Sequence, residues 1–121
     1  MPHVTFVNTF LLHAPAEEFE RAFAATSEFM AARPGFLWHQ LLRPLEPAPL
    51  EPAPLEPGPL EPGQHGSRYV NVAAWRDEES FRAAVTHPGF APHAAALRAL
   101  AASEPVLYET RQTRTTVTEP A

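Results

Sequence analysis

Residues 68–81 read Arg68-Tyr-Val-Asn-Val-Ala-Ala-Trp75-Arg-Asp-Glu-Glu-Ser-Phe81, and this stretch predicts a strand that runs directly into a helix. Side chains alternate between the two faces of a strand, so Asn71 and Trp75 share one face and the two valines point the other way. Asp77 can accept hydrogen bonds from the free backbone N–H groups of the following turn, which predicts a helix start. Trp75 is therefore expected at the end of a sheet strand, where pockets commonly open.

The sequence on either side of this stretch alternates between strand-like and helix-like patterns. Apolar residues recur at every second position near the start of the chain, and at helical spacing after Pro15. A Pro-Gly pair ends that first helix, and a second one interrupts the last helix. Pro105 is expected to stop the last helix. In chain order, the prediction is a strand at 3–13, a helix from 15 to 33, strands at 36–43 and 68–75, helices at 78–86 and 90–102, and a strand at 106–113.

This order of elements predicts an α+β fold of the ferredoxin-like βαββαβ type. Such a split sandwich has a four-stranded antiparallel sheet with both helices on one face. The other face is expected to carry Leu37, Val70 and Val72 and to remain open. A monomer rarely exposes so large an apolar surface, so we expect a homodimer in which a second copy covers this face.

A repeat interrupts the globular pattern. Residues 44–63 contain four copies of Pro-Leu-Glu-Pro, each followed by Ala or Gly, and they hold eight of the fifteen prolines. Closely spaced proline removes backbone donors and fixes φ, so this segment is predicted to be an extended or disordered hairpin insertion. The sequence therefore predicts a single domain over 1–113 that is interrupted by a loop at 44–66 and followed by a flexible tail at 114–121.

The composition excludes several classes of function. The 121 residues include no cysteine, which rules out disulfides, thiolate metal ligands and cysteine nucleophiles. The formal charge is −5 and no basic cluster is visible, so nucleic acid is not an expected partner. No apolar run approaches ~18 residues and the start of the chain lacks a signal-peptide pattern, so we expect a cytoplasmic protein without a membrane span. No metal or phosphate motif is present, and histidines such as His39 and His87 lack ligand spacing.

Three motifs together point to a known family. They are Arg33-Pro-Gly-Phe-Leu37 after the first helix, Tyr69-Val-Asn-Val-Ala-Ala-Trp75 followed by Glu79-Ser-Phe81, and the helix break His87-Pro-Gly-Phe90. On these motifs, the chain resembles the antibiotic biosynthesis monooxygenase family, which consists of small dimeric α+β barrels. The resemblance spans the chain apart from the proline-rich insertion and the tail.

The resemblance implies a cofactor-independent monooxygenase that oxidises an aromatic, polyketide-type small molecule, such as an anthrone, phenol or hydroquinone, with O₂. In the anthrone-oxidising members an Asn and a Trp four residues later hold the substrate, and Asn71 and Trp75 match these positions. A tyrosine of those members corresponds to Phe81, and their arginine corresponds approximately to Arg98. We expect His93 to move the proton, because it borders the inward stripe of the last helix. The expected substrate-binding residues are Asn8, Phe81, Phe6 and Arg98.

Two alternatives remain open. Haem-degrading relatives use an Asn on the first strand, a helical Trp and a helical His as axial ligand, which would correspond to Asn8, Ala84 and His93. The second alternative is a dimer that binds a small molecule without catalysis. Asn8 and Asn71 could also bond only to backbone, and Trp75 could simply fill the end of the core. An apolar cavity in which the amides converge would favour a binding site over a purely structural role.

Overall fold

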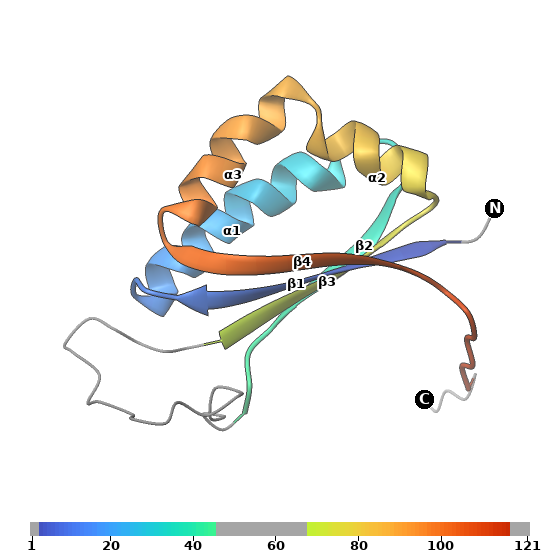
Figure 1. The fold of residues 1–121 in the computed structure, drawn as a ribbon, viewed down its shortest axis with the longest axis horizontal. Helices are drawn as coiled ribbons and strands as arrows, with labels where there is room; N and C mark the ends of the chain where they lie inside the picture. Colours follow the sequence, from blue (N-terminus) through green and yellow to red (C-terminus); the bar gives the residue numbers. More distant parts are fainter. Residues whose placement is uncertain (1–2, 46–67, 117–121) are drawn as a thin grey trace, which may run out of the picture.

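The structure, a computed structural model, describes residues 3–45 and 68–116 (Figure 1). Most of the predicted proline-rich insertion and the end of the tail lie outside the described residues. The elements are β1 (Val4–Leu12), α1 (Ala16–Ala31), β2 (Phe36–Leu42), β3 (Arg68–Trp75), α2 (Glu78–Val85), the 3₁₀ turn η1 (Pro88–Phe90), α3 (Ala91–Arg98) and β4 (Ala101–Glu109).

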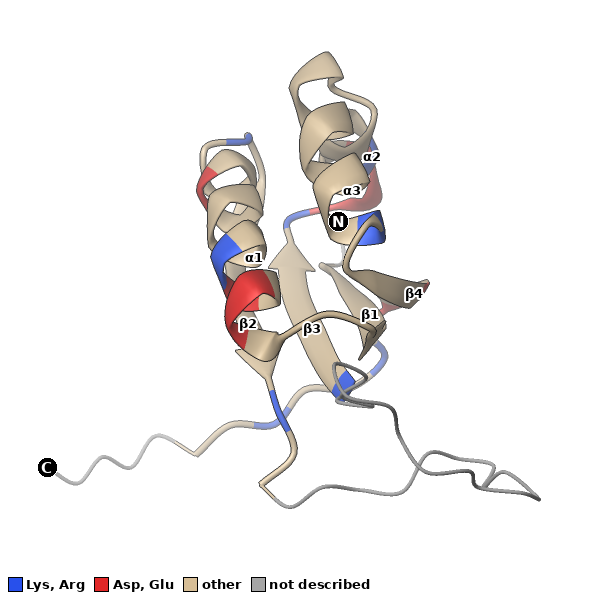
Figure 2. Cartoon of the chain, turned by 90° about the vertical axis from the view of Figure 1, so that its left-hand side faces the viewer, with Lys and Arg blue, Asp and Glu red and all other residues tan. Residues whose placement is uncertain are grey.

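The four strands form one antiparallel sheet in the order β2-β3-β1-β4. The helices all lie on the same side of this sheet (Figure 1). Viewed along the strands, α1 lies over the half of the sheet with β2 and β3, while α3 lies over the half with β1 and β4 (Figure 2). The predicted ferredoxin-like α+β fold is therefore confirmed.

The boundary between the last helix and the last strand differs from the prediction. The helix α3 ends at Arg98, and β4 already begins at Ala101. Pro105 does not stop a helix but lies inside β4, opposite Asn8 of β1. An edge strand tolerates proline because one side of its backbone needs no partner in the sheet, and β4 is an edge strand. The alanine-rich sequence around this point suits a helix as well as a strand end, so local pattern alone placed the boundary wrongly.

The core consists of two clusters on the inner face of the sheet, one at each end. Between them, the middle row of the inner face carries Asn8 and Asn71, which pair across β1 and β3. The apolar packing is therefore interrupted at the centre of the sheet. The first cluster contains Phe10, Leu12, Phe19, Phe23, Tyr69, Leu97 and Ala101. The second contains Val4, Ala73, Trp75, Phe81 and Ala84.

The predicted alternation along β3 is confirmed. Tyr69, Asn71, Ala73 and Trp75 are all buried on the inner face. The hydroxyl of the buried Tyr69 donates a hydrogen bond to a carboxylate oxygen of Glu20 on α1. Burial and this hydrogen bond raise the pKa of the Tyr69 phenol, so it stays protonated and holds the start of β3 to α1.

The turn between α1 and β2 packs closely against the start of α2. Gly35 has a φ of +87°, which a glycine adopts without strain. A Cβ at this position would lie 2.3 Å from Cβ of Ser80, so only glycine allows this approach. The carbonyl of Gly35 also accepts a hydrogen bond of 2.7 Å from the backbone N–H of Arg76. This packing fixes the start of α2 against the turn that precedes β2.

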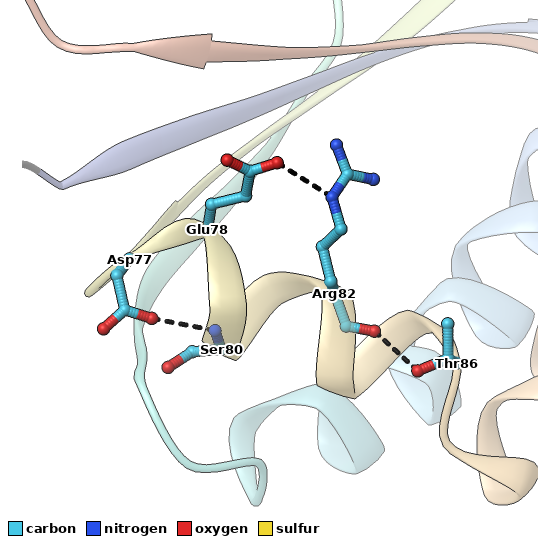
Figure 3. A network of polar contacts seen from close by, with 5 residues as sticks. All are labelled: Asp77, Glu78, Ser80, Arg82 and Thr86. Atoms are coloured by element: carbon cyan, nitrogen blue, oxygen red, sulfur yellow. Dashed lines mark hydrogen bonds and ion pairs between the residues drawn. The ribbon is translucent and has the colours of Figure 1, made fainter.

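Asp77 caps α2 as predicted, and Figure 3 shows its contacts. Its carboxylate accepts a 2.8 Å hydrogen bond from the backbone N–H of Ser80, which lowers the pKa of Asp77. On the next turns, Arg82 pairs with Glu78 at 2.9 Å, and the hydroxyl of Thr86 donates to the carbonyl of Arg82 at 2.7 Å. The cap and these local bonds define a short helix that presents Phe81 to the core.

We expect Asp77→Ala to lower the melting temperature by several degrees at pH 7, because the first turn of α2 loses its acceptor. Since the folded-state pKa of Asp77 lies below its ordinary value of 3.8, the carboxylate stabilises the fold above that pH. The stabilisation is lost as the pH falls through the folded-state pKa, so the difference between the two proteins should shrink in acid. Thermal unfolding followed by circular dichroism across pH measures this. Asp77→Asn, which keeps the acceptor oxygen, is the control. A fall in the melting temperature of Asp77→Ala that does not vary with pH would contradict the charge contribution.

The outer face of the sheet carries no helix in the described part of the chain (Figure 1). Its central row contains Val72, Val7 and Val106 on three neighbouring strands, with Gln40 at the end of the row. We call this side of the sheet the outer face. The large apolar side chains exposed there or at its margin are Leu11, Leu37, Trp38, Leu42, Val106 and Tyr108. Within residues 3–45 and 68–116, no helix combines the length and apolar character needed to cross a membrane.

Candidate active site

A cavity of about 530 Å³ lies between the inner face of the sheet and the helices. All four strands and all three α-helices contribute side chains to its wall, and most of these are apolar or aromatic. The cavity occupies the region between the two core clusters, above the middle row of the sheet. Of the predicted site residues, those that line it are Phe6, Asn8, Asn71, Trp75, Phe81 and Arg98.

Two amide side chains form the polar centre of the cavity wall. Asn8 and Asn71 lie directly opposite each other on β1 and β3, so their Cβ atoms are about 5 Å apart. The Oδ1 atoms of both are buried and have no hydrogen-bond partner in the described protein. A buried amide without partners costs about 1–3 kcal/mol. Two such groups side by side indicate a place where a ligand supplies the missing hydrogen bonds.

Aromatic rings form one end of the cavity. Phe81 lies between Phe6 and Trp75, with ring centroids 4.7 Å and 5.9 Å away. Trp75 also contacts Phe36 edge to face at 5.2 Å. Trp75 is only 1% exposed, so it belongs to the core and lines the cavity at the same time. These rings offer flat apolar surface against which an aromatic molecule can pack.

The structure does not bring His93 to the cavity. Its ring packs instead against Phe29 of α1, with a centroid distance of 5.4 Å. The residues of α3 that line the cavity are Ala94, Leu97 and Arg98, which share a different stripe of the helix. His93 precedes that stripe by one residue, and a step of one residue turns the side chain by about 100°. The proton-transfer role expected for His93 therefore has no geometric support.

His39 lies in the cavity instead, and the sequence analysis assigned it no role. Strict alternation from Phe36 would place Trp38 inward and His39 outward. A bulge between Phe36 and Trp38 shifts the register by one residue. A shift of one residue exchanges the two faces of a strand, so Trp38 becomes exposed and His39 faces inward. The sequence carries no clear signal of this bulge.

Charge at the cavity comes from two arginines. Arg82 and Arg98 line it from α2 and α3, and both are exposed, which places them at its rim. Arg82 is paired with Glu78, whereas Arg98 has no ion pair with a described residue. No Asp or Glu is among the described residues that line the cavity. A ligand with an anionic or electron-rich edge would fit this rim.

The haem alternative does not fit the observed arrangement. It requires Asn8, a helical Trp and His93 around one pocket. Asn8 lines the cavity but His93 does not, and Ala84 is buried in the second core cluster. The described part of the chain therefore does not assemble the axial ligand and the aromatic residue on which that prediction rested. It also contains no group of three or more acidic or histidine residues suited to a metal ion.

Comparison with known proteins identifies clear relatives. The deoxynogalonate monooxygenase of Streptomyces nogalater is 44% identical over 110 residues, which cover 91% of this chain and 78% of that protein. The crystal structure of SnoaB, a cofactor-independent oxygenase from the same organism, is 42% identical, superposes with a TM-score of 0.75, and covers 93% of this chain and 97% of SnoaB.

More distant structures share the fold. A Deinococcus radiodurans protein described as a candidate antibiotic biosynthesis monooxygenase superposes with a TM-score of 0.65 at 14% identity, and covers 95% of this chain and 99% of its own. At this identity the similarity shows the fold alone. No family model matches the sequence.

Proposed function

The chain belongs to the antibiotic biosynthesis monooxygenase family, and from this membership we propose that it is a cofactor-independent monooxygenase that oxidises an aromatic, polyketide-type molecule with dioxygen. The observation that carries the proposal is the aromatic-walled cavity of about 530 Å³ with two amide side chains at its centre, whose Oδ1 atoms have no hydrogen-bond partner in the described protein. Its volume lies within the ~300–1,000 Å³ usual for small-molecule sites. The similarity to a cofactor-independent oxygenase supports the same conclusion.

The substrate class follows from the chemistry of the wall. The rings of Phe6, Trp75 and Phe81 provide apolar surface for a flat, fused-ring molecule. Asn8 and Asn71 provide amide groups that can bond a hydroxyl or carbonyl oxygen attached to those rings. Arg98 at the rim suits an oxygen-rich or anionic edge. An anthrone, phenol or hydroquinone has all of these features.

The reaction needs little more than deprotonation and shielding. Loss of a proton turns such a substrate into an electron-rich anion that can pass an electron to dioxygen directly. Amide N–H groups at Asn8 and Asn71 would stabilise the negative oxygen of that anion, in an environment where hydrogen bonds act more strongly than in water. The apolar wall would exclude water from the reactive intermediate. No bound cofactor is required by this scheme.

We expect Asn71→Ala to lower the rate of oxygen uptake with anthrone by about tenfold to a hundredfold, because one stabilising amide is lost. Its melting temperature should stay nearly unchanged, since Oδ1 of Asn71 makes no hydrogen bond to any residue that the structure describes. An oxygen electrode and a thermal unfolding scan provide the two measurements. The control is Gln112→Ala, which removes an exposed amide that follows β4 and lies outside the sheet.

The two measurements separate binding roles from structural ones. Equal losses of activity and stability in Asn71→Ala would mean that the amide supports the fold. A wild-type protein that binds anthrone but consumes no oxygen would be a non-catalytic binding protein, and the proposed function would be wrong.

We further propose that the protein is a homodimer joined through the outer face. The central row of three valines and the exposed Trp38 and Tyr108 support this arrangement. Burial of such a surface against a second copy is favourable by about 25 cal/mol for each Å² of apolar area. β1 and β2 carry no Asp, Glu, Lys or Arg, and the charged residues that the register places on this face are Arg68 of β3 and Glu104 of β4, away from the central valine row.

A further inference from the structure

The cavity wall leaves few choices for a proton acceptor. Its described lining contains no Asp, Glu, Lys, Tyr or Cys. The side chains of Arg82 and Arg98 stay protonated in proteins and cannot take up a proton. His39 is the one lining residue of the described chain whose side chain can act as a base near neutral pH. A reaction that begins with substrate deprotonation in this cavity therefore depends on His39 or on solvent.

The local geometry positions the His39 ring. Its Nε2 lies 2.6 Å from the hydroxyl oxygen of Ser27 on α1. The rings of Phe23 and Phe36 flank it, with centroid distances of 5.7 Å and 6.0 Å. Its Nδ1 is buried and has no hydrogen-bond partner in the described protein. A ring held at one nitrogen and unpartnered at the other has the arrangement of a general base.

The position of His39 in the sheet places it beside the amide pair. His39 lies opposite Ala73 on β3, two residues from Asn71 on the same inner face. Neighbours offset diagonally by two residues are about 7–8 Å apart, a span that one substrate ring can bridge. A substrate whose oxygen bonds to Asn71 can therefore bring an acidic C–H or O–H close to the His39 ring, whose unpartnered Nδ1 is the nitrogen left to accept the proton.

We propose that His39, positioned by Ser27, is the general base that removes the substrate proton through Nδ1 and returns it to the peroxide formed with dioxygen. This inference rests on the proposed oxygenase function and adds a catalytic residue to it. With Nε2–H donated to the Ser27 hydroxyl, the lone pair of Nδ1 is free to accept the proton. Ser27 then holds the imidazolium in place until the proton is returned.

The steps balance for an anthrone, whose ring CH₂ group is oxidised to C=O. His39 takes one C–H proton, and the resulting anion gives one electron to O₂. The substrate radical and superoxide combine to form a C–O bond, and the imidazolium protonates the peroxide. His39 then removes the second C–H proton while the O–O bond breaks, which leaves the ketone. The departing hydroxide takes up that proton, so CH₂ and O₂ give C=O and H₂O.

The central experiment compares His39→Gln with wild type and with His93→Ala, which removes a histidine outside the cavity. With anthrone as substrate, we expect kcat for oxygen uptake to fall by about 10²–10⁴-fold in His39→Gln, while KM changes only a few-fold. His93→Ala should retain wild-type kcat. Added imidazole should restore part of the rate in His39→Ala, because the truncated side chain leaves room beside Ser27. An unchanged kcat in His39→Gln would overturn the inference.

A pH profile separates a base from a structural residue. We expect wild-type kcat to fall in acid, where an imidazolium cannot accept a proton, and His39→Gln to lose this dependence. Ser27 of α1 contacts His39 directly. The other polar side chains that share the cavity wall with His39 are Asn8, Thr26, Asn71 and Ser103, with Arg82 and Arg98 on α2 and α3, so no second residue of ordinary near-neutral acid–base chemistry lines the described cavity. An acid limb that persists in His39→Gln would assign the titration to another group and contradict the proposal.

Mixing without oxygen distinguishes this inference from the proposed function. In the absence of O₂, the wild-type protein should accumulate the coloured anthrone anion, and His39→Gln should not. Anion formation that depends on His39, without later oxygen uptake, would retain the base but refute the oxygenase. Oxygen uptake with equal anion formation in both proteins would retain the oxygenase but refute His39 as the base. Thermal unfolding of each variant shows that the comparison is made between folded proteins.

Discussion

Replacement of Trp75 by alanine is expected to lower the free energy of unfolding by about 3–5 kcal/mol, the range for large aromatic residues in cores. The side chain is 1% exposed and packs against Phe36 and Phe81. Its removal would also open the aromatic end of the cavity, so the vacated space could fill with water instead of collapsing. Urea denaturation measures the loss, and Trp38 remains as a fluorescent reporter.

The graded variant Trp75→Phe tests the mechanism of this loss. A phenyl ring restores most of the contact with Phe81 and should recover at least half of the lost stability. If Trp75 also holds the substrate, Trp75→Phe should recover less of the activity than of the stability, because the smaller ring leaves the cavity wider. A destabilisation below ~1 kcal/mol in Trp75→Ala would contradict the core position of the indole, since that is the range of surface substitutions.

Local signals predicted the exact bounds of β3 and the residue that caps α2. The alternation from Tyr69 to Trp75 and the acceptor at Asp77 both act within a few positions of the chain, so they do not depend on distant partners. The same reasoning placed Asn8 and Asn71 on the inner face, and the sheet register then brought them directly opposite each other. The order of strands and helices followed from these patterns.

Features that depend on pairing between distant segments were not predictable in this way. The bulge in β2 arises from its pairing with β3, and it alone turns His39 inward and Trp38 outward. The start of β4 at Ala101 is likewise set by its pairing with β1. Helical periodicity placed Phe90, Ala94 and Leu97 on the inward stripe, and all three line the cavity, but His93 stands one residue before Ala94 and packs on Phe29 instead. The candidate base was therefore missed for a structural reason.

The proposed dimer leads to the second large effect. Val106→Asp is expected to weaken self-association by at least about a thousandfold, which corresponds to about 4 kcal/mol. Val106 is 42% exposed in the single chain and sits at the end of the valine row with Val7 and Val72. In a dimer joined through the outer face, each copy would bury an unpaired carboxylate, which costs several kcal/mol.

The design of this test depends on a variant that leaves the single chain intact. Because Val106 is exposed on an edge strand, Val106→Asp should change the stability of an isolated chain by no more than about 1 kcal/mol. The near-isosteric Val106→Thr is the control and should retain most of the dimer. Analytical ultracentrifugation over a range of concentrations gives the dissociation constants. If Val106→Asp associates as tightly as wild type, the outer face is not the interface; if wild type is itself monomeric, the exposed valine row requires a different partner.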